Sequence, residues 1–177
     1  MSYRDNLLTI AAATVAAIEA LTDQWEAGEL PEEEFTALVA ARVALGNTRS
    51  AALADLGLAA ELTRAVGRDV LPLGLLPPTG DPDRLAKAVR VIVTDDPATV
   101  RMRLIRLADN EPKDTASTAR GRGISRSRHT TGWTRGVNPA GCKACQGLAG
   151  PVLSKNTTMW RHAGCSCAQI PTTQEAP

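Results

Sequence analysis

All four cysteines of this 177-residue chain lie within its last forty residues, together with one of its two histidines. They form a CxxC pair that is followed, after sixteen intervening residues, by an HxxCxC segment. Thiolates and imidazoles at such spacings are ligands of tetrahedral zinc, because one tight turn can place two donors on the same ion. The spacing therefore predicts a metal site. Its candidate ligands are Cys142, Cys145, His162, Cys165 and Cys167.

Four ligands complete a structural zinc site, so these five donors include one more than the ion needs. We expect Cys142 and Cys145 to bind together with two of His162, Cys165 and Cys167. We expect His162 to act with either Cys165 or Cys167, and the sequence leaves that choice open.

The cysteines also allow two other states, which are a pair of disulfides and reduced thiols without metal. A small module at residues 136–171 with few apolar side chains needs a staple to fold, which favours metal or disulfide over free thiols. The CxxC pair would also suit a small thiol redox protein, although no βαβ pattern surrounds it. Residues 146–161 contain no carboxylate that could act as a general base, so we expect a structural zinc and no enzymatic activity.

Positive charge is concentrated in the same half of the chain as the cysteines. Residues 1–100 carry 8 Lys and Arg against 15 Asp and Glu, a net charge of −7, whereas residues 101–177 carry 12 against 4, a net charge of +8. Guanidinium groups bind phosphate well through their planar fork, so the stretch 110–135 is a candidate contact for nucleic acid or for an acidic protein surface. The sequence favours neither partner. The arginines expected to make the contact are Arg120, Arg122, Arg126, Arg128 and Arg135.

The elements that precede these residues are predicted to be helical. Apolar residues recur every three or four positions over residues 3–28, which predicts an amphipathic helix. Pro31 and three glutamates begin a second helix that we expect to end near Gly46, and Thr48 begins a third. The stretch 70–80 is rich in proline and interrupts the helical pattern. Two Asp-Pro pairs beyond it each begin a shorter helix.

These patterns divide the chain into four regions. Residues 1–109 form a helical domain, and residues 110–135 form a basic Ser/Thr/Arg-rich arm that is extended or becomes helical on a partner. Residues 136–171 form a Cys/His module of the zinc-knuckle type, and residues 172–177 form a disordered tail. The predicted fold class is mainly α with a small C-terminal Cys/His module.

The beginning of the chain lacks the pattern of a secretory signal. Arg4 and Asp5 precede its apolar residues, and the run at residues 9–20 is too short and too rich in alanine to span a bilayer. We therefore expect a protein that is kept in a reducing cytosol and has no membrane partner. Clustered cysteines in that compartment indicate metal binding more than disulfides.

The C-terminal segment resembles that of a known family. The residues that carry the likeness are Gly132-Trp133-x-Arg135, the CxxC within residues 140–152, the closing HxxCxC and Pro171. Their order is similar to the end of phage head-morphogenesis proteins of the Mu F type, the MuF-like minor capsid proteins. The likeness covers about forty residues, while the upstream helices match the family only in kind.

The resemblance implies a structural virion protein that is made in the host cytoplasm and lies in the capsid interior or near the portal. It implies portal, major capsid or scaffold protein as partners, packaged DNA as a further contact, and multiple copies in each virion. Two other functions stay open on the sequence. They are a zinc-knuckle regulator that binds nucleic acid and a small thiol redox protein.

Overall fold

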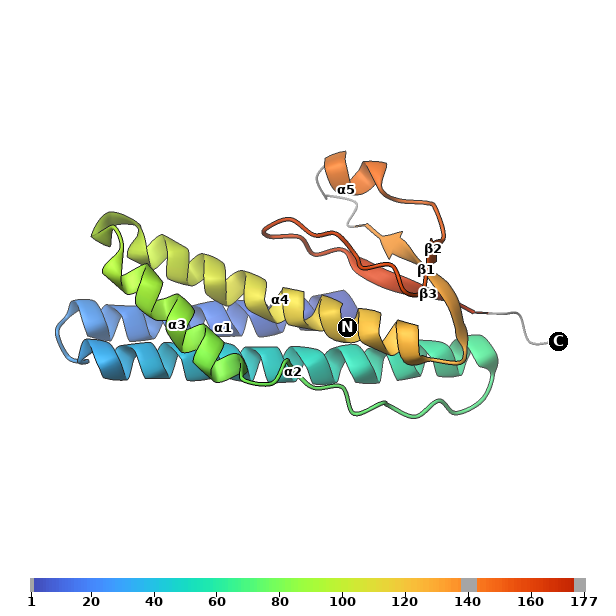
Figure 1. The fold of residues 1–177 in the computed structure, drawn as a ribbon, viewed down its shortest axis with the longest axis horizontal. Helices are drawn as coiled ribbons and strands as arrows, with labels where there is room; N and C mark the ends of the chain where they lie inside the picture. The colour runs from blue at the N-terminus through green and yellow to red at the C-terminus, as the bar shows by residue number, and fades with distance from the viewer. Residues whose placement is uncertain (1, 138–142, 174–177) are drawn as a thin grey trace.

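The computed structural model describes residues 2–137 and 143–173, and its described part is mainly helical. Long helices form an elongated bundle, and a small sheet covers one end of it (Figure 1). The helices are α1 (Tyr3–Glu26), α2 (Glu32–Val66), α3 (Asp81–Thr94), η1 (Pro97–Thr99), α4 (Val100–Arg126) and α5 (Lys143–Gly147). The strands are β1 (Thr130–Gly136), β2 (Leu153–Ser154) and β3 (Ala168–Thr173).

Helix α1 matches the helix predicted over residues 3–28. It begins with a capping box in which the Asp5 amide donates to Ser2 Oγ and the Ser2 amide donates to the Asp5 carboxylate. Its buried face includes Leu7, Ala11 and Ile18, and it packs against α2 and α4. Among the described helices, α1 alone has the length and apolar composition to cross a bilayer. Helices in the core of globular proteins can have the same length and composition.

Helix α2 is a single helix, so the prediction of two helices that meet near Gly46 is wrong. A Cβ atom at Gly46 would lie 2.6 Å from Thr14 Oγ1 and 3.2 Å from Pro112 Cγ. Gly46 is therefore the place where α1 and α4 approach α2 closely, and it does not end the helix. Thr48 donates its hydroxyl to the carbonyl of Ala44 one turn earlier instead of capping a new helix.

The boundary expected at residue 109 lies inside α4, and most of the expected arm is the second half of this helix. Ala116, Ala119 and Ile124 are buried against α2 and its neighbours, and the rest of the expected arm continues into β1. Small side chains at helical spacing are enough to pack α4 on α2, which the polar composition of the segment concealed. The segment is thus folded against the bundle within this chain.

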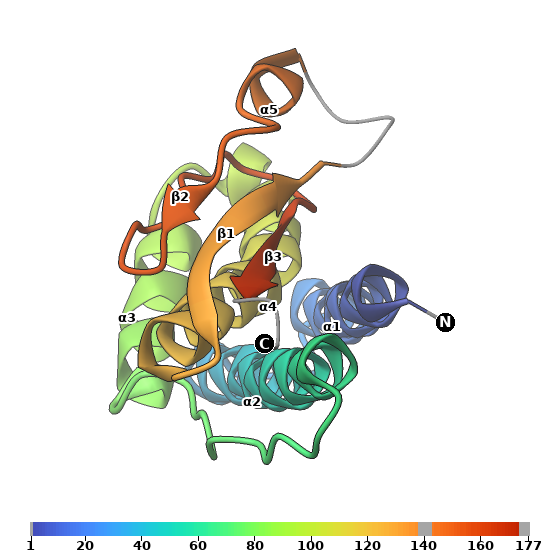
Figure 2. The same ribbon diagram turned by 90° about the vertical axis from the view of Figure 1, so that its right-hand side faces the viewer.

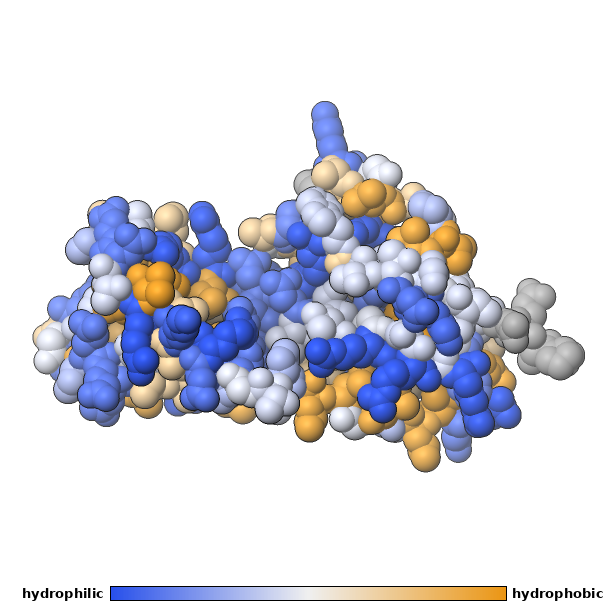
Figure 3. Space-filling model, in the orientation of Figure 1, coloured by the Kyte–Doolittle hydropathy of each residue, from blue (hydrophilic) through white to orange (hydrophobic). Residues whose placement is uncertain are grey.

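The segment between α2 and α3 is held by one side chain of α2. The Asp55 carboxylate accepts hydrogen bonds from the backbone amides of Leu73, Gly74 and Leu75 at 2.7 to 3.0 Å. Leu75 is buried, whereas neighbouring leucines of the segment face solvent along the lower edge of the molecule (Figure 3). The loop is therefore fixed by polar contacts to its backbone and by one apolar anchor.

The sheet is antiparallel in the order β2-β1-β3, and Figure 2 shows α5 on the side of it that faces away from α2. Trp133 of β1 is fully buried among residues of α2 and α4, and its indole nitrogen donates to the Thr157 carbonyl. Thr172 and Thr173, expected in the tail, pair with β1. The remaining tail residues 174–177 lie outside the described part of the chain.

Arg120 joins the sheet to the bundle. Its side chain is 2% exposed, and its Nε donates to the Gln169 carbonyl of β3 at 2.6 Å. Its Nη2 pairs with Glu61 of α2, and its guanidinium lies 4.7 Å from the ring centroid of Tyr3 of α1. One buried cation thus connects β3, α2 and α1 through α4. The expectation that Arg120 contacts a partner is wrong, because its donors face the interior.

Candidate metal centre

Three of the predicted ligands converge in the structure. The donor atoms of Cys145, His162 and Cys165 all lie within 4.8 Å of one another. Cys145 Sγ lies 3.2 Å from His162 Nε2 and 3.7 Å from Cys165 Sγ. Both thiols are buried, at 1% and 2% exposure. This group can bind a metal ion, with one donor from α5 and two from the turn that precedes β3.

The separation of the two sulfur atoms distinguishes a disulfide from the other two states that the sequence allowed. A tetrahedral zinc with Zn–S bonds of about 2.3 Å holds two thiolates about 3.8 Å apart. A disulfide would bring the sulfurs to about 2.0 Å. The observed 3.7 Å fits the first of these distances, and Cys145, Cys165 and Cys167 are all free thiols. The distance therefore excludes a Cys145–Cys165 disulfide and is compatible with a bound metal ion.

A tight turn brings His162 and Cys165 to the same point. The Cys165 amide donates to the His162 carbonyl at 3.1 Å, and Gly164 lies in the left-handed region with φ of 72°. Glycine adopts this conformation without the steric cost that a side chain would add. The Gly164 amide also donates to Asn110 Oδ1 of α4 at 2.6 Å, so the bundle fixes the position of the turn. Asn110 had no signal in the sequence that marked it for this role.

The two nitrogens of His162 have different surroundings. Nδ1 lies 2.7 Å from the Ala163 carbonyl oxygen, which can only accept a hydrogen bond. That contact places the proton of a neutral imidazole on Nδ1 and leaves the lone pair of Nε2 directed at Cys145. The ring of the half-exposed Trp160 lies beside the imidazole with 5.8 Å between centroids. His162 is thus oriented as a metal-binding histidine requires.

The environment of Cys165 favours its thiolate form. Burial opposes ionisation, but the Cys167 backbone N–H and the side chains of Cys167 and Cys145 hydrogen-bond to the sulfur. Together with the charge of Arg161, these contacts lower the pKa of Cys165 to about 7. The thiolate is the form that binds metal, so the protein environment prepares this sulfur as a ligand.

Arg135 lies beside the sulfur of Cys145, although its place in the basic stretch predicted a contact with nucleic acid or an acidic partner. It is 6% exposed, its Nη2 donates to the Trp160 carbonyl at 2.5 Å, and its Nη1 lies 4.0 Å from Cys145 Sγ. A buried guanidinium in this position offsets the negative charge of nearby thiolates. The earlier assignment of Arg135 is therefore wrong, because β1 directs it into the module.

The other two predicted ligands are Cys167 and Cys142. Cys167 is buried in the same cluster as Cys145 and Cys165, but its sulfur is not among the three donors that converge. Cys142 lies outside the described residues. The described part of the chain thus supplies three convergent ligands, and the sequence spacing supplies the expectation that Cys142 is the fourth.

The remaining predicted arginines, Arg122, Arg126 and Arg128, are exposed. Arg120 and Arg122 are only two positions apart in α4, yet a helix turns by roughly 200° over that step, so one faces the interior and the other faces solvent. Lys155 and the hydroxyl side chains that line a cavity together with Arg122 and Arg126 were not predicted from the sequence. An isolated lysine and scattered threonines give no periodic signal that could have revealed them.

Comparisons of the chain with protein-family models, with curated proteins and with solved structures find no match. They assign the chain to no family, so the resemblance of residues 132–171 to MuF-like proteins stays a prediction from the sequence.

Proposed function

We propose that this protein is a structural, MuF-like minor capsid protein of phage heads, and that its Cys/His cluster binds one structural zinc ion. The convergence of Cys145, His162 and Cys165 within 4.8 Å supports the zinc site. The likeness of residues 132–171 to the end of MuF-like proteins supports the role in head assembly. Zinc is favoured over harder cations because the donors are thiolates and an imidazole.

The zinc would act as a staple for the outer part of the C-terminal module. Within residues 2–137 and 143–173, the cluster formed by Cys145, Cys165 and Cys167 has only Val137 packed against it as a partly buried apolar neighbour. So small an apolar cluster contributes little stability by itself, and small modules of this kind depend on metal. Cys145 would bind from α5, and His162 and Cys165 would bind from the turn before β3. The ion would thereby join α5 to the sheet.

The elongated bundle and the sheet at its end offer separate surfaces for assembly. The first turn of α2 presents Glu32, Glu33 and Glu34 at the surface, whereas α4 presents Arg122 and Arg126 near the sheet. Portal, major capsid or scaffold protein would contact the acidic bundle, and packaged DNA is a further contact for the basic end. The protein would act in multiple copies in the capsid interior or near the portal after assembly in the host cytoplasm.

The zinc site is tested on the purified full chain under reducing conditions. We expect about one zinc per chain by elemental analysis, and loss of that zinc in Cys145→Ser. After chelation, hydrogen exchange should increase in residues 143–167, while α1, α2 and the buried face of α4 keep their protection because they pack independently of the ion. Metal-free protein from cells supplied with zinc would contradict the proposal. Formation of a Cys145–Cys165 disulfide in such protein would favour the redox alternative.

The role in head assembly is tested by expressing the chain with the genes that flank its own. We expect the flanking genes to encode portal and major capsid protein, and we expect mass spectrometry to find the chain in several copies in the purified heads. Heads assembled without this gene serve as the control for co-purification. Heads that form normally and exclude the chain would contradict this role and leave the zinc result unaffected.

A further inference from the structure

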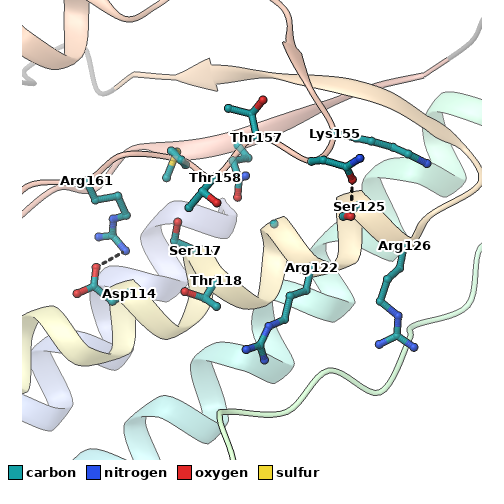
Figure 4. A pocket seen from close by; sticks show the side chains of 14 residues that line it. Asp114, Ser117, Thr118, Arg122, Ser125, Arg126, Lys155, Thr157, Thr158 and Arg161 are labelled. Atoms are coloured by element: carbon teal, nitrogen blue, oxygen red, sulfur yellow. Dashed lines mark hydrogen bonds and ion pairs between the residues drawn. The ribbon is translucent and has the colours of Figure 1, made fainter.

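A cavity of about 470 Å³ lies between α4 and the segment that joins β2 to β3. Figure 4 shows Lys155, Thr157 and Thr158 on one side of α4, and Arg122 and Arg126 extending from the other edge of this helix, away from them. All of these side chains line the cavity. Among the described residues, four cationic and five hydroxyl side chains line the cavity, against a single carboxylate, that of Asp114. This lining is built for a ligand that carries negative charge and several oxygen atoms.

We propose that this groove binds the phosphates of a nucleic-acid strand. Arg122 and Arg126 are exposed and lie one helical turn apart on α4. Residues at this spacing have Cβ atoms about 5–6 Å apart, so the two guanidiniums can contact neighbouring phosphates of one strand. Within the described residues neither arginine pairs with a carboxylate, so both are available to an external anion.

The inner end of the groove contains polar groups that lack partners. The side chain of Arg161 is 8% exposed and lies 3.0 Å from Asp114, yet its Nε has no hydrogen-bond partner in the described part of the chain. Gln169 is 1% exposed, and its side-chain oxygen is likewise without a partner there. Buried polar atoms without partners are costly. An oxygen atom of a ligand or of water can accept from Arg161 Nε, and a water molecule can donate to Gln169 Oε1.

The one carboxylate in the groove is a weak obstacle to an anion. Asp114 forms an ion pair with Arg161, and burial raises its pKa above the ordinary value for an aspartate. Its negative charge is thus already offset from within the protein. The lining retains an excess of positive charge from Arg122, Arg126 and Lys155.

Hydroxyl groups favour phosphate over a protein carboxylate as the ligand. Ser117, Thr118, Thr157 and Thr158 line the cavity together with the cationic side chains, and they can donate hydrogen bonds to several oxygens of one compact anion. The lining residues that the structure describes include no aromatic side chain on which a base could stack, so binding should be independent of sequence. The inference rests on the DNA contact proposed for the basic end, which it locates in this groove, and it stands without the zinc site.

The experiment measures binding of a fluorescein-labelled dT12 oligonucleotide to the full-length protein by anisotropy over a range of salt concentrations. We expect the double variant Arg122→Gln/Arg126→Gln to bind about tenfold or more weakly at ~50 mM salt. The slope of log K against log salt should fall in magnitude by about 1.4, since each phosphate contact on a single strand contributes about 0.7. Lys155→Gln, on the other side of α4, should weaken binding in the same direction.

The matched control is Arg42→Gln/Arg49→Gln, which removes two exposed arginines of α2 outside the groove. We expect this variant to retain the affinity and salt slope of the unmodified protein. Equal losses of affinity for dT12 in the two double variants, or no binding of dT12 by the unmodified protein, would overturn the proposal. Competition by polyglutamate of equal charge as strong as that by unlabelled dT12 would assign the groove to an acidic peptide instead. Competition by inorganic phosphate at an equal phosphate concentration would assign it to a free phosphate.

Discussion

The guanidinium Nη1 of Arg135 lies 4.0 Å from the sulfur of Cys145, although the two residues belong to β1 and α5. The same guanidinium holds the Trp160 carbonyl through Nη2 at 2.5 Å. Arg135 therefore connects the central strand of the sheet with both segments that carry the candidate ligands. Its positive charge is placed where thiolates would otherwise repel one another.

Substitution of Arg135 by glutamine should weaken zinc binding about tenfold or more, because groups that support metal ligands typically contribute 10–100-fold to affinity. The affinity is measured by competition with a chromophoric chelator under reducing conditions. Arg128→Gln is the matched control, since Arg128 is exposed and lies in the same region of the chain. Equal zinc affinities for the two variants would show that Arg135 does not support the site.

The fourth ligand is identified by comparing Cys142→Ser with Cys167→Ser. We expect Cys142→Ser to lose zinc as Cys145→Ser does, because a CxxC turn supplies both of its sulfurs to one ion. Cys167→Ser should retain about one zinc per chain, since its sulfur lies outside the convergent group while its backbone N–H still supports Cys165. Elemental analysis of the purified variants gives the answer. The reverse pattern would make Cys167 the ligand and Cys142 the surplus thiol.

Arg120→Met should lower the free energy of unfolding by about 3 kcal/mol, because removal of one partner of a buried ion pair leaves the other uncompensated. The value is at the low end of the range for buried pairs, since the partner Glu61 is 27% exposed. Urea denaturation measures the change. Arg122→Met, two positions away and exposed, should change stability by less than about 0.5 kcal/mol. Similar losses of unfolding free energy in the two variants would contradict the role of Arg120 in joining the sheet to the bundle.

Gly132→Ala should destabilise the sheet by about 1–3 kcal/mol, which is the usual cost of adding a methyl group where no space exists. A Cβ atom at Gly132 would collide with the Leu153 carbonyl oxygen of β2, and backbone cannot move aside as a flexible side chain can. Gly147→Ala is the control, because no atom lies within 4 Å of a Cβ atom at that position. The melting temperatures of both variants provide the comparison. An unchanged melting temperature in Gly132→Ala would show that the Leu153 carbonyl of β2 does not lie against Gly132.

Local patterns in the sequence were sufficient for the helices whose ends carry explicit signals. The apolar repeat over residues 3–28 predicted α1, because a helix needs one continuous apolar face to pack. The same reasoning failed at Gly46, where glycine serves the approach of α1 to α2 and leaves the helix unbroken. It also failed across residue 109, because the small buried residues of α4 are hidden among polar ones.

The sequence by itself determined which residue types could bind a metal, because the CxxC and HxxCxC spacings place donors on tight turns. Only the tertiary structure decided which arginines serve which purpose. Arg120 and Arg135 are buried as internal partners, whereas Arg122 and Arg126 are exposed at the edge of a groove that the segment after β2 also lines. Charged residues can be counted in the sequence. The direction in which each charged side chain points depends on the rotation of its helix and on the register of the sheet. Those are set by long-range packing, which no single segment encodes.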